Sequence, residues 1–235
     1  MTNHLMSAIS IQSLHYTWPG ATEAVLNIGR FDLQAGETVF LSGPSGSGKS
    51  TLLAAIAGVI DIPDGTVTVR GQDLSALSGS ARDRFRAAHL GIIFQVFNLL
   101  PWLSPVENVL LPCRFSGIRR QQAGPDPAVT AAHLLRDLGL GDPALQNAPA
   151  SALSVGQQQR VAAARALIGA PGVVLADEPT SALDEDAKTG FVDLLLRECA
   201  AAGTSLLFVS HDRSLARHFD RAEDLRDLQS AGVPC

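Results

Sequence analysis

The sequence predicts an α/β protein in which helices cover both faces of a parallel β-sheet. Short apolar runs without polar alternation are typical of strands covered on both sides, and segments with helical patterning separate them. These runs are residues 38–41, 90–94, 173–176 and 205–209. The chain has 235 residues, of which 46% are apolar and 17% are charged. This composition supports a buried core and excludes a disordered chain.

The segments around these runs complete the expected organisation. Ile9 and Ile11 alternate with polar residues, and residues 25–33 form a second strand candidate. Between residues 98 and 156 the pattern changes to short helical pieces, such as residues 128–138, which prolines separate. We therefore expect a mostly helical insertion within the α/β core.

Charge and composition narrow the functional class. Proteins that bind duplex nucleic acid present a basic surface, whereas this chain has a net charge of -5. We therefore expect no nucleic-acid partner. No window approaches the roughly 18 to 20 unbroken apolar residues of a membrane span. Cys113, Cys199 and Cys235 are an odd number at unrelated spacings, which indicates reduced thiols and a cytosolic location.

A glycine-rich segment between a predicted strand and a predicted helix satisfies the phosphate-loop pattern G-x-x-x-x-G-K-[ST]. The segment consists of Gly43, Pro44, Ser45, Gly46, Ser47, Gly48, Lys49, Ser50 and Thr51. Its glycines allow backbone N–H groups to surround an anion at the positive end of the helix. Lys49 is expected to reach the β- and γ-phosphates of a nucleotide, and the Ser50 hydroxyl to bind Mg²⁺. The alternative is a glycine-rich turn that binds nothing.

Two carboxylates follow the apolar run at residues 173–176. Ligands of an α/β sheet collect at the carboxyl ends of its strands, so Asp177 is placed to hold Mg²⁺ or one of its waters. Glu178 is placed to polarise the water that attacks the γ-phosphate. A carboxylate pair at a strand end is weak evidence for a catalytic site by itself. It becomes strong evidence when it lies downstream of a phosphate loop. The sequence lacks the H-R-D and D-F-G motifs of protein kinases.

Residues 153–160 read LSVGQQQR and resemble the LSGGQ signature motif of the ATP-binding-cassette (ABC) ATPases. The other landmarks of that family match in order along nearly the whole chain. They are the aromatic Trp18 (with Tyr16 as the second choice), the phosphate loop, Gln95, the signature, Asp177–Glu178, residues 181–184 and His211. The resemblance implies a P-loop NTPase fold with a RecA-like core sheet, an N-terminal antiparallel β subdomain and an inserted helical subdomain. Residues 98–156 would form the helical subdomain, and residues 1–97 and 157–235 the remainder of a single ABC ATPase domain.

The resemblance also implies roles for individual residues. Trp18 would stack on adenine, and its alternative is a half-buried strand aromatic. Gln95 would sense Mg²⁺ and the attacking water, or merely close its strand. His211 would bind the γ-phosphate and hold Glu178. The residues that would contact the nucleotide around the signature and the following loop are Ser154, Gly156, Gln157 and Asp184.

The signature implies a dimer. Ser154 and the N–H group of Gly156 begin a predicted helix and would bind the γ-phosphate held by a second copy, so that two ATP molecules are buried between two subunits. The sequence departs from the family at Val155, where glycine is usual. A β-branched residue tolerates positive φ poorly, so we expect negative φ at Val155, with its side chain toward the partner or solvent.

The resemblance implies an ATPase that drives a separate membrane permease. Residues 96–112 are unusually apolar and would form the docking groove, although half of them are expected to pack the helical subdomain. The local sequence looks most like that of the lipoprotein-releasing and macrolide-exporter branch, whose permeases are FtsX/MacB-like. The segments that carry this resemblance are residues 97–101, 107–109 and 157–162. The ATPase would then lie in the cytoplasm, peripheral on the inner membrane of a bacterium. The alternative is a slow-turnover or binding-only structural ATPase subunit of a cell-envelope complex.

Overall fold

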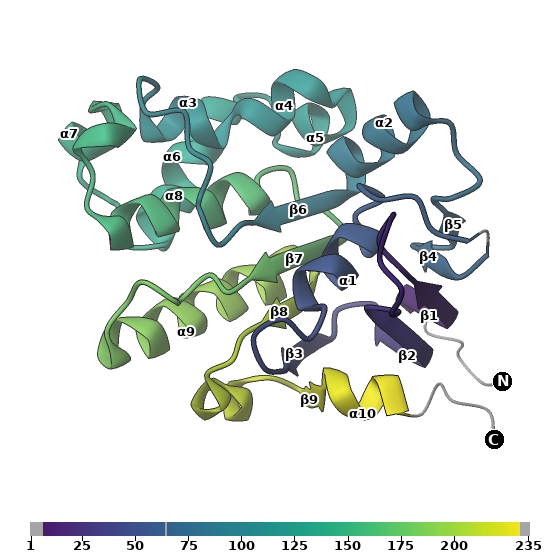
Figure 1. Cartoon of the computed structure of the whole chain (residues 1–235). Coiled ribbons are helices and arrows are strands. Elements are labelled where there is room, and N and C mark those ends of the chain that lie inside the picture. The colour runs from purple at the N-terminus through teal and green to yellow at the C-terminus, as the bar shows by residue number, and fades with distance from the viewer. Residues whose placement is uncertain (1–6, 64, 231–235) are drawn as a thin grey trace, which may run out of the picture.

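The computed structural model describes residues 7–63 and 65–230 and arranges their strands in two sheets (Figure 1). The strands are β1 (Ser7–Tyr16), β2 (Leu26–Gln34), β3 (Thr38–Ser42), β4 (Val67–Val69), β5 (Gln72–Asp73), β6 (Leu90–Ile93), β7 (Val173–Asp177), β8 (Ser205–Val209) and β9 (Arg221–Asp224). The first sheet is antiparallel, in the order β2-β1-β4-β5. The second is parallel, in the order β6-β7-β8-β3-β9. The predicted parallel sheet and N-terminal antiparallel sheet are therefore confirmed.

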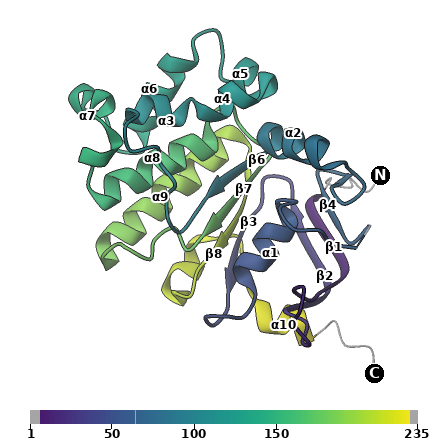
Figure 2. The same cartoon turned by 45° about the horizontal axis from the view of Figure 1, so that its top comes forward.

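Helices cover both faces of the parallel sheet (Figure 2). The helices are α1 (Lys49–Ile56), α2 (Gly79–His89), α3 (Pro105–Val109), α4 (Leu111–Phe115), α5 (Gly117–Gln122), α6 (Pro127–Asp137), α7 (Pro143–Asn147), α8 (Val155–Leu167), α9 (Glu185–Ala202) and α10 (Leu225–Ser230), with 3-10 turns η1 (Ala150–Ala152) and η2 (Arg213–His218). Among the described residues, no helix combines the length and apolar character needed to cross a bilayer. Cys113 and Cys199 are buried free thiols, and Cys235 lies outside the described residues.

The two faces of the parallel sheet belong to two hydrophobic cores. In β8, Leu206 and Phe208 pack into the core that contains α8 and α9. Leu207 and Val209 of the same strand pack into the core that contains α1 and the antiparallel sheet. Since both sets of alternate side chains are buried, the strand has no polar face. This explains why the predicted strand runs lack alternation.

The segment between β6 and α8 consists of short helices, and proline and capping residues mark the start of three of them. Proline occupies the first position of α3, α6 and α7, where its missing N–H group costs no hydrogen bond. The residue before each proline caps the helix: Ser104, Asp126 and Asp142 accept hydrogen bonds from first-turn N–H groups. The expected subdomain boundary after residue 156 falls in the first turn of α8, because the signature segment caps that helix.

A buried arginine joins these short helices to the sheet. Arg119 of α5 is fully buried, and its guanidinium donates to the carbonyl oxygens of Ile168 at 2.5 Å, Ala166 at 2.8 Å and Leu90 at 3.2 Å. Burial lowers the pKa of Arg119 to about 10. The carbonyls at the end of α8 carry partial negative charge, so they compensate part of the cost of burying this cation.

Replacing Arg119 tests how strongly this joint stabilises the fold. We expect Arg119→Met to lower the free energy of unfolding by about 2–4 kcal/mol, because it leaves several buried carbonyls without a donor. The exposed neighbour Arg120 provides the control, and Arg120→Met is expected to change stability by less than about 0.5 kcal/mol. Chemical denaturation measures both values, and equal midpoints for the two variants would contradict the prediction.

Candidate functional site

The glycine-rich segment forms the turn between β3 and α1, as the sequence predicts. Gly48 has φ +98°, and a Cβ atom at this residue would lie 2.7 Å from the carbonyl oxygen of Val25. Only glycine satisfies both constraints. The helix α1 then starts at Lys49, whose ammonium lies within the loop and donates to the carbonyls of Gly43 at 2.8 Å and Pro44 at 2.9 Å.

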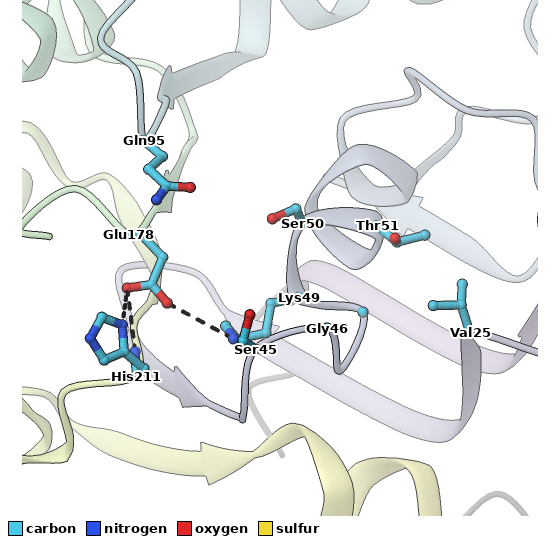
Figure 3. Close-up of a pocket in the computed structure, with 10 residues that line it drawn as sticks. Val25, Ser45, Gly46, Lys49, Ser50, Thr51, Gln95, Glu178 and His211 are labelled. Atoms are coloured by element: carbon cyan, nitrogen blue, oxygen red, sulfur yellow. Dashed lines mark hydrogen bonds and ion pairs between the residues drawn. The ribbon is translucent and has the colours of Figure 1, made fainter.

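This loop borders a cavity of about 570 Å³ that opens at the carboxyl edge of the parallel sheet (Figure 3). The residues that line the cavity are Val25, Ser45, Gly46, Gly48, Lys49, Ser50, Thr51, Gln95, Glu178 and His211. Segments that are distant in sequence, from the start of β2 to the loop after β8, therefore surround one space. Loop residues Gly43, Pro44 and Ser47 complete the same turn without lining the cavity.

Glu178 has an unusual backbone conformation. It follows β7 with φ +46°, a left-handed value that is uncommon for a residue with a side chain. Its N–H group donates to the carbonyl oxygen of Val209 at 2.9 Å, which ties it to the end of the adjacent strand β8. A residue in this conformation costs free energy, which the surrounding structure must compensate. Such residues cluster at functional sites.

The carboxylate of Glu178 lies between a cation and an imidazole. Its Oε2 atom is 2.7 Å from Nδ1 of His211, and its Oε1 atom is 3.9 Å from Nζ of Lys49. The side chain of Glu178 is 12% exposed, whereas that of His211 is 64% exposed. The hydroxyl of Ser210 also donates to Oε2, at 3.4 Å. The acid is thus fixed at the cavity wall, while the imidazole reaches solvent.

Asp177 lies beneath this site with an oxygen that lacks a partner. Its Oδ1 atom is buried and makes no hydrogen bond. Burial raises the pKa of Asp177, a hydrogen bond from Ser50 opposes that shift, and the charge of Glu178 adds to it. A buried carboxylate oxygen without a donor, beside a serine hydroxyl, fits the oxygen ligand set of Mg²⁺. The described residues hold no cluster of three or more His, Cys, Asp or Glu that would bind a metal without help from phosphate oxygens.

The signature residues lie outside the cavity, at the N-terminus of α8. The hydroxyl of Ser154 accepts from the N–H group of Gln157 at 3.3 Å, and Oε1 of Gln157 accepts from the N–H group of Ser154 at 2.9 Å. Val155 is the first residue of the helix, with negative φ as expected and 49% of its surface exposed. The capping box therefore forms although valine replaces glycine.

Two more sequence candidates lie apart from the cavity lining. Trp18 follows β1, is 43% exposed, and packs edge-on against Tyr16 with ring centroids 5.2 Å apart. Asp184 caps α9 by accepting from the N–H group of Ala187 at 2.9 Å. Conversely, sequence reasoning missed Val25 and Ser210. Val25 acts through its backbone oxygen, and Ser210 is marked only by its place between an apolar strand and His211.

Comparison with known proteins assigns the family. The model of the family described as ABC transporter matches residues 26–181, which include the loop, Gln95 and the strand that ends in Asp177. The chain belongs to the ABC transporter family. It is an ABC ATPase, as the sequence predicts, and it matches the ATP-hydrolysing subunits of such transporters.

Relatives and solved structures of this ABC ATPase agree with that assignment. The chain is 43% identical over 197 residues to "Lipoprotein-releasing system ATP-binding protein LolD 2" of Caulobacter vibrioides, covering 83% of each chain. It is 47% identical to LolD of Anaeromyxobacter dehalogenans, covering 82% of this chain and 79% of that one. A dimeric post-hydrolysis structure of the ATP-binding cassette MJ0796 with ADP and Pi superposes with a TM-score of 0.78 at 31% identity, covering 92% of this chain and 93% of that one. The P-loop NTPase fold class is therefore confirmed.

Two glycines with positive φ allow a test that separates the effect of backbone strain from the effect of a Cβ collision in the phosphate loop. We expect Gly48→Ala to reduce ATP affinity by at least about tenfold, because its Cβ atom would displace the loop from the oxygen of Val25. Gly36 also has positive φ, +77°, but a Cβ atom at this residue would have no heavy atom within 4 Å. Gly36→Ala is therefore expected to cost about 1–2 kcal/mol of stability without changing ATP affinity. Equal ATP affinities of the two variants in a nucleotide titration would refute this account.

Proposed function

We propose that this ABC ATPase powers a separate membrane permease of the lipoprotein-release or export type from the cytoplasmic face of a bacterial inner membrane. The hydrolytic part of the proposal rests on Glu178, whose carboxylate is held at the cavity wall between His211 and Lys49. This arrangement suits hydrolysis of a nucleotide whose phosphates lie in the loop at residues 43–51. The names of the LolD relatives support the choice of branch.

In the proposed reaction, Glu178 acts as the general base. A water molecule attacks the γ-phosphorus, its proton passes to the carboxylate of Glu178, and the bond from that phosphorus to the bridging β-γ oxygen breaks. ADP leaves with the bridging oxygen, and inorganic phosphate forms. His211 holds the carboxylate and donates to a γ-phosphate oxygen, while Lys49 exchanges its loop carbonyls for phosphate oxygens.

Asp177, Ser50 and Gln95 are the proposed Mg²⁺ residues. The buried, unpartnered oxygen of Asp177 and the neighbouring hydroxyl of Ser50 provide the ligands, with Gln95 at the cavity wall. When bound, Mg²⁺ neutralises charge on the β- and γ-phosphates. Trp18, half exposed beyond β1, is the proposed adenine platform.

We propose a homodimer that closes over two ATP molecules. Ser154, Gly156 and Gln157 lie at the N-terminus of a 13-residue helix, outside the cavity of their own chain, and would face the γ-phosphate of the partner. Asp184, which is exposed at the N-terminus of α9, would contact the same interface. Loss of the γ-phosphate removes the anion between the two copies, so hydrolysis loosens the dimer.

A groove of about 540 Å³ between α2, β6 and α4 is the proposed docking site for the permease. Phe94, Leu111 and Phe115 line it, and Arg84, Arg86 and Asp83 lie among its polar residues. Phe115 is 76% exposed. An apolar floor and an excess of guanidinium groups suit a short amphipathic segment of the permease that bears an acidic residue.

The groove uses only part of the predicted docking stretch at residues 96–112. Leu111 and Pro112 line the groove, whereas Asn108 and Val109 are fully buried in packing. Asn108 bonds the backbone of Leu100 in both directions, at 2.8 and 3.1 Å, and so fixes the loop that leads into α3. Residues beyond the stretch, Phe94 and Phe115, provide most of the exposed aromatic surface of the groove.

Replacing the proposed base tests the mechanism. We expect Glu178→Gln to retain ATP binding, to accumulate as an ATP-bound dimer, and to lower kcat by about 10²–10⁴-fold, since the amide cannot accept the water proton. Asp186→Asn, an exposed carboxylate on α9, is the control and should hydrolyse ATP at the wild-type rate. Steady-state phosphate release and size-exclusion chromatography measure these outcomes. Wild-type turnover by Glu178→Gln would remove this residue from the role of base.

The docking groove is tested by placing a charge on its exposed aromatic wall. We expect Phe115→Asp to abolish co-purification with the cognate permease, because the carboxylate replaces the apolar contact and repels an acidic segment. Val129→Asp, at a half-exposed residue of α6, is the matched control and should leave co-purification unchanged. A wild-type yield of complex with Phe115→Asp would exclude the groove. Absence of nucleotide turnover in the wild-type complex would instead favour a binding-only structural subunit.

A further inference from the structure

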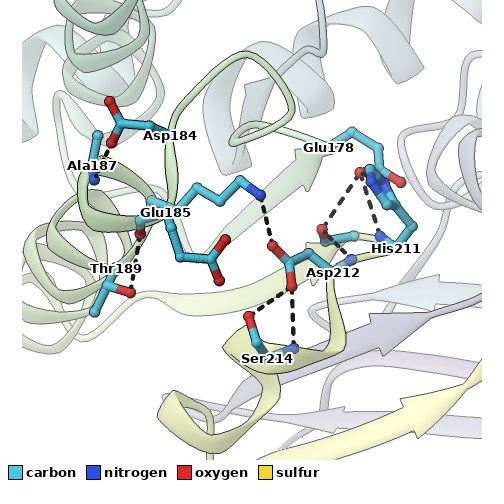
Figure 4. A network of polar contacts seen from close by, with 10 residues as sticks. Glu178, Asp184, Glu185, Ala187, Thr189, His211, Asp212 and Ser214 are labelled. Carbon is cyan, nitrogen blue, oxygen red and sulfur yellow. Dashed lines mark hydrogen bonds and ion pairs between the residues drawn. The ribbon is translucent and has the colours of Figure 1, made fainter.

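Glu178, His211 and Asp212 lie close to the start of α9, where Asp184 and Glu185 lie (Figure 4). A lysine of α9 connects this helix to the loop that carries His211 and Asp212. Lysine occurs at only two positions of this chain, Lys49 in the phosphate loop and Lys188 at the end of the first turn of α9. The phosphate loop accounts for the first. The second lies outside every motif of the sequence and outside the cavity lining.

Lys188 forms an ion pair with the residue that follows His211. Its Nζ atom lies 2.8 Å from Oδ2 of Asp212, and each side chain is only 19% exposed. The hydrogen bond to Asp212 raises the pKa of Lys188. Hydrogen bonds from Lys188 and then Ser214 lower the pKa of Asp212 to about 2. Both groups therefore stay charged over the whole neutral pH range.

Two hydrogen bonds through Ser210 link the backbone of Asp212 to the carboxylate of Glu178. The N–H group of Asp212 donates to the hydroxyl of Ser210 at 3.1 Å, and that hydroxyl donates to Oε2 of Glu178 at 3.4 Å. The imidazole of His211, between these two residues, contacts the same oxygen at 2.7 Å. Asp212 therefore directly follows His211 in the chain and bonds Ser210, and these are the two residues that contact Oε2.

A backbone hydrogen bond fixes Lys188 to the end of the loop that follows Glu178. Its own N–H group donates to the carbonyl oxygen of Asp184 at 2.9 Å, within the first turn of α9. Residues 178–184 start at the carboxylate that His211 holds and end at this turn. The ion pair therefore closes a ring: Glu178, the following loop, Lys188, Asp212 and back to Glu178.

We propose that Lys188 is a positioning residue for ATP hydrolysis, which holds His211 against Glu178 by fixing Asp212 to the start of α9. This inference rests on the proposed roles of Glu178 and His211. In the dimer, a contact made at Asp184 then reaches the carboxylate through two short paths, the loop itself and the ion pair. Without the pair, His211 and the start of α9 shift independently, and the base loses its alignment.

A simpler role for the pair is to attach α9 to η2. A second link between these elements separates the two roles. Nδ1 of His218 lies 2.9 Å from Oδ1 of Asp193, and Asp193 has no contact with the ring around Glu178 among the interactions of the described residues. Asp193→Asn thus weakens the same helix-to-turn junction and is the matched control.

The test compares ATP turnover of dimeric Lys188→Met, Lys188→Arg and Asp193→Asn. We expect Lys188→Met to lower kcat about five- to tenfold with KM for ATP within about twofold, as for an interaction that matters in the transition state. Lys188→Arg, which keeps the charge, should recover most of kcat, and Asp193→Asn should keep it. The melting temperatures of both variants are measured beside kcat, because Asp193 is more exposed than the Lys188–Asp212 pair and its loss should cost less stability.

A double-mutant cycle locates the effect. Lys188→Met combined with Asp212→Asn should be no slower than the slower single variant, because both remove one interaction. Equal losses of kcat in Lys188→Met and Asp193→Asn, or additive losses in the cycle, would overturn the positioning role. Wild-type kcat in Lys188→Met, while Glu178→Gln is inactive, would overturn this inference alone. Turnover by Glu178→Gln would instead overturn the proposed function on which it rests.

Discussion

The hydrogen bond between Glu178 and His211 depends on the order of strands in the parallel sheet. β7, β8 and β3 are consecutive neighbours, so their carboxyl ends deliver Glu178, His211 and the phosphate loop to one edge. Strand pairing in register, with Asp177 opposite Val209, brings the N–H group of Glu178 to the carbonyl of Val209. The left-handed backbone at Glu178 then turns its side chain toward His211 and Lys49. An antiparallel β7 would separate the acid from the imidazole by the length of a strand.

The sequence predicts those parts of the fold whose signals are local and repeated. The four uninterrupted apolar runs match β3, β6, β7 and β8 to within a residue, because alternate side chains enter two different cores. The sequence analysis did not predict β9, because it is a short edge strand in which Ala222 is the one apolar residue; the ion pair of Arg221 with Glu37 helps to hold it. Within the site, motif residues were found by spacing, whereas Val25 and Ser210 contribute a backbone oxygen and a loop hydroxyl. Such contributions depend on tertiary geometry that residue types do not encode.

The helices between β6 and α8 share a hydrophobic core with α8 and the parallel sheet, and guanidinium groups that donate to backbone carbonyls add directional joints to this packing. Arg119 bonds the last carbonyls of α8, and Arg160 donates to the carbonyl of Leu138 at 2.7 Å. Arg165 donates to the carbonyls of Phe97 at 2.5 Å and Asn98 at 2.7 Å, and burial lowers its pKa. These joints are directional, and they lack the strong mutual attraction of a buried ion pair. They therefore fix the orientation of the helical segment, which apolar packing against α8 also holds in place.

The helix α8 carries residues of two proposed contact surfaces and of one joint to the loop after Gln95. Its first turn carries the capping box of Ser154, and its last turn carries Arg165, which lines the proposed docking groove and bonds the loop after Gln95. Thirteen helical residues span about 20 Å, and a helix of this length moves as a rigid rod. In the proposed function, a permease segment in the groove would contact Arg165, which lies in the last turn of the helix that Ser154 caps and which bonds the loop after Gln95. Because the same helix bears the proposed groove contact and the proposed phosphate contact, and shares a buried core with Ile93 and Val174 of the parallel sheet, any movement that couples the two contacts must also change the packing of α8 against that sheet.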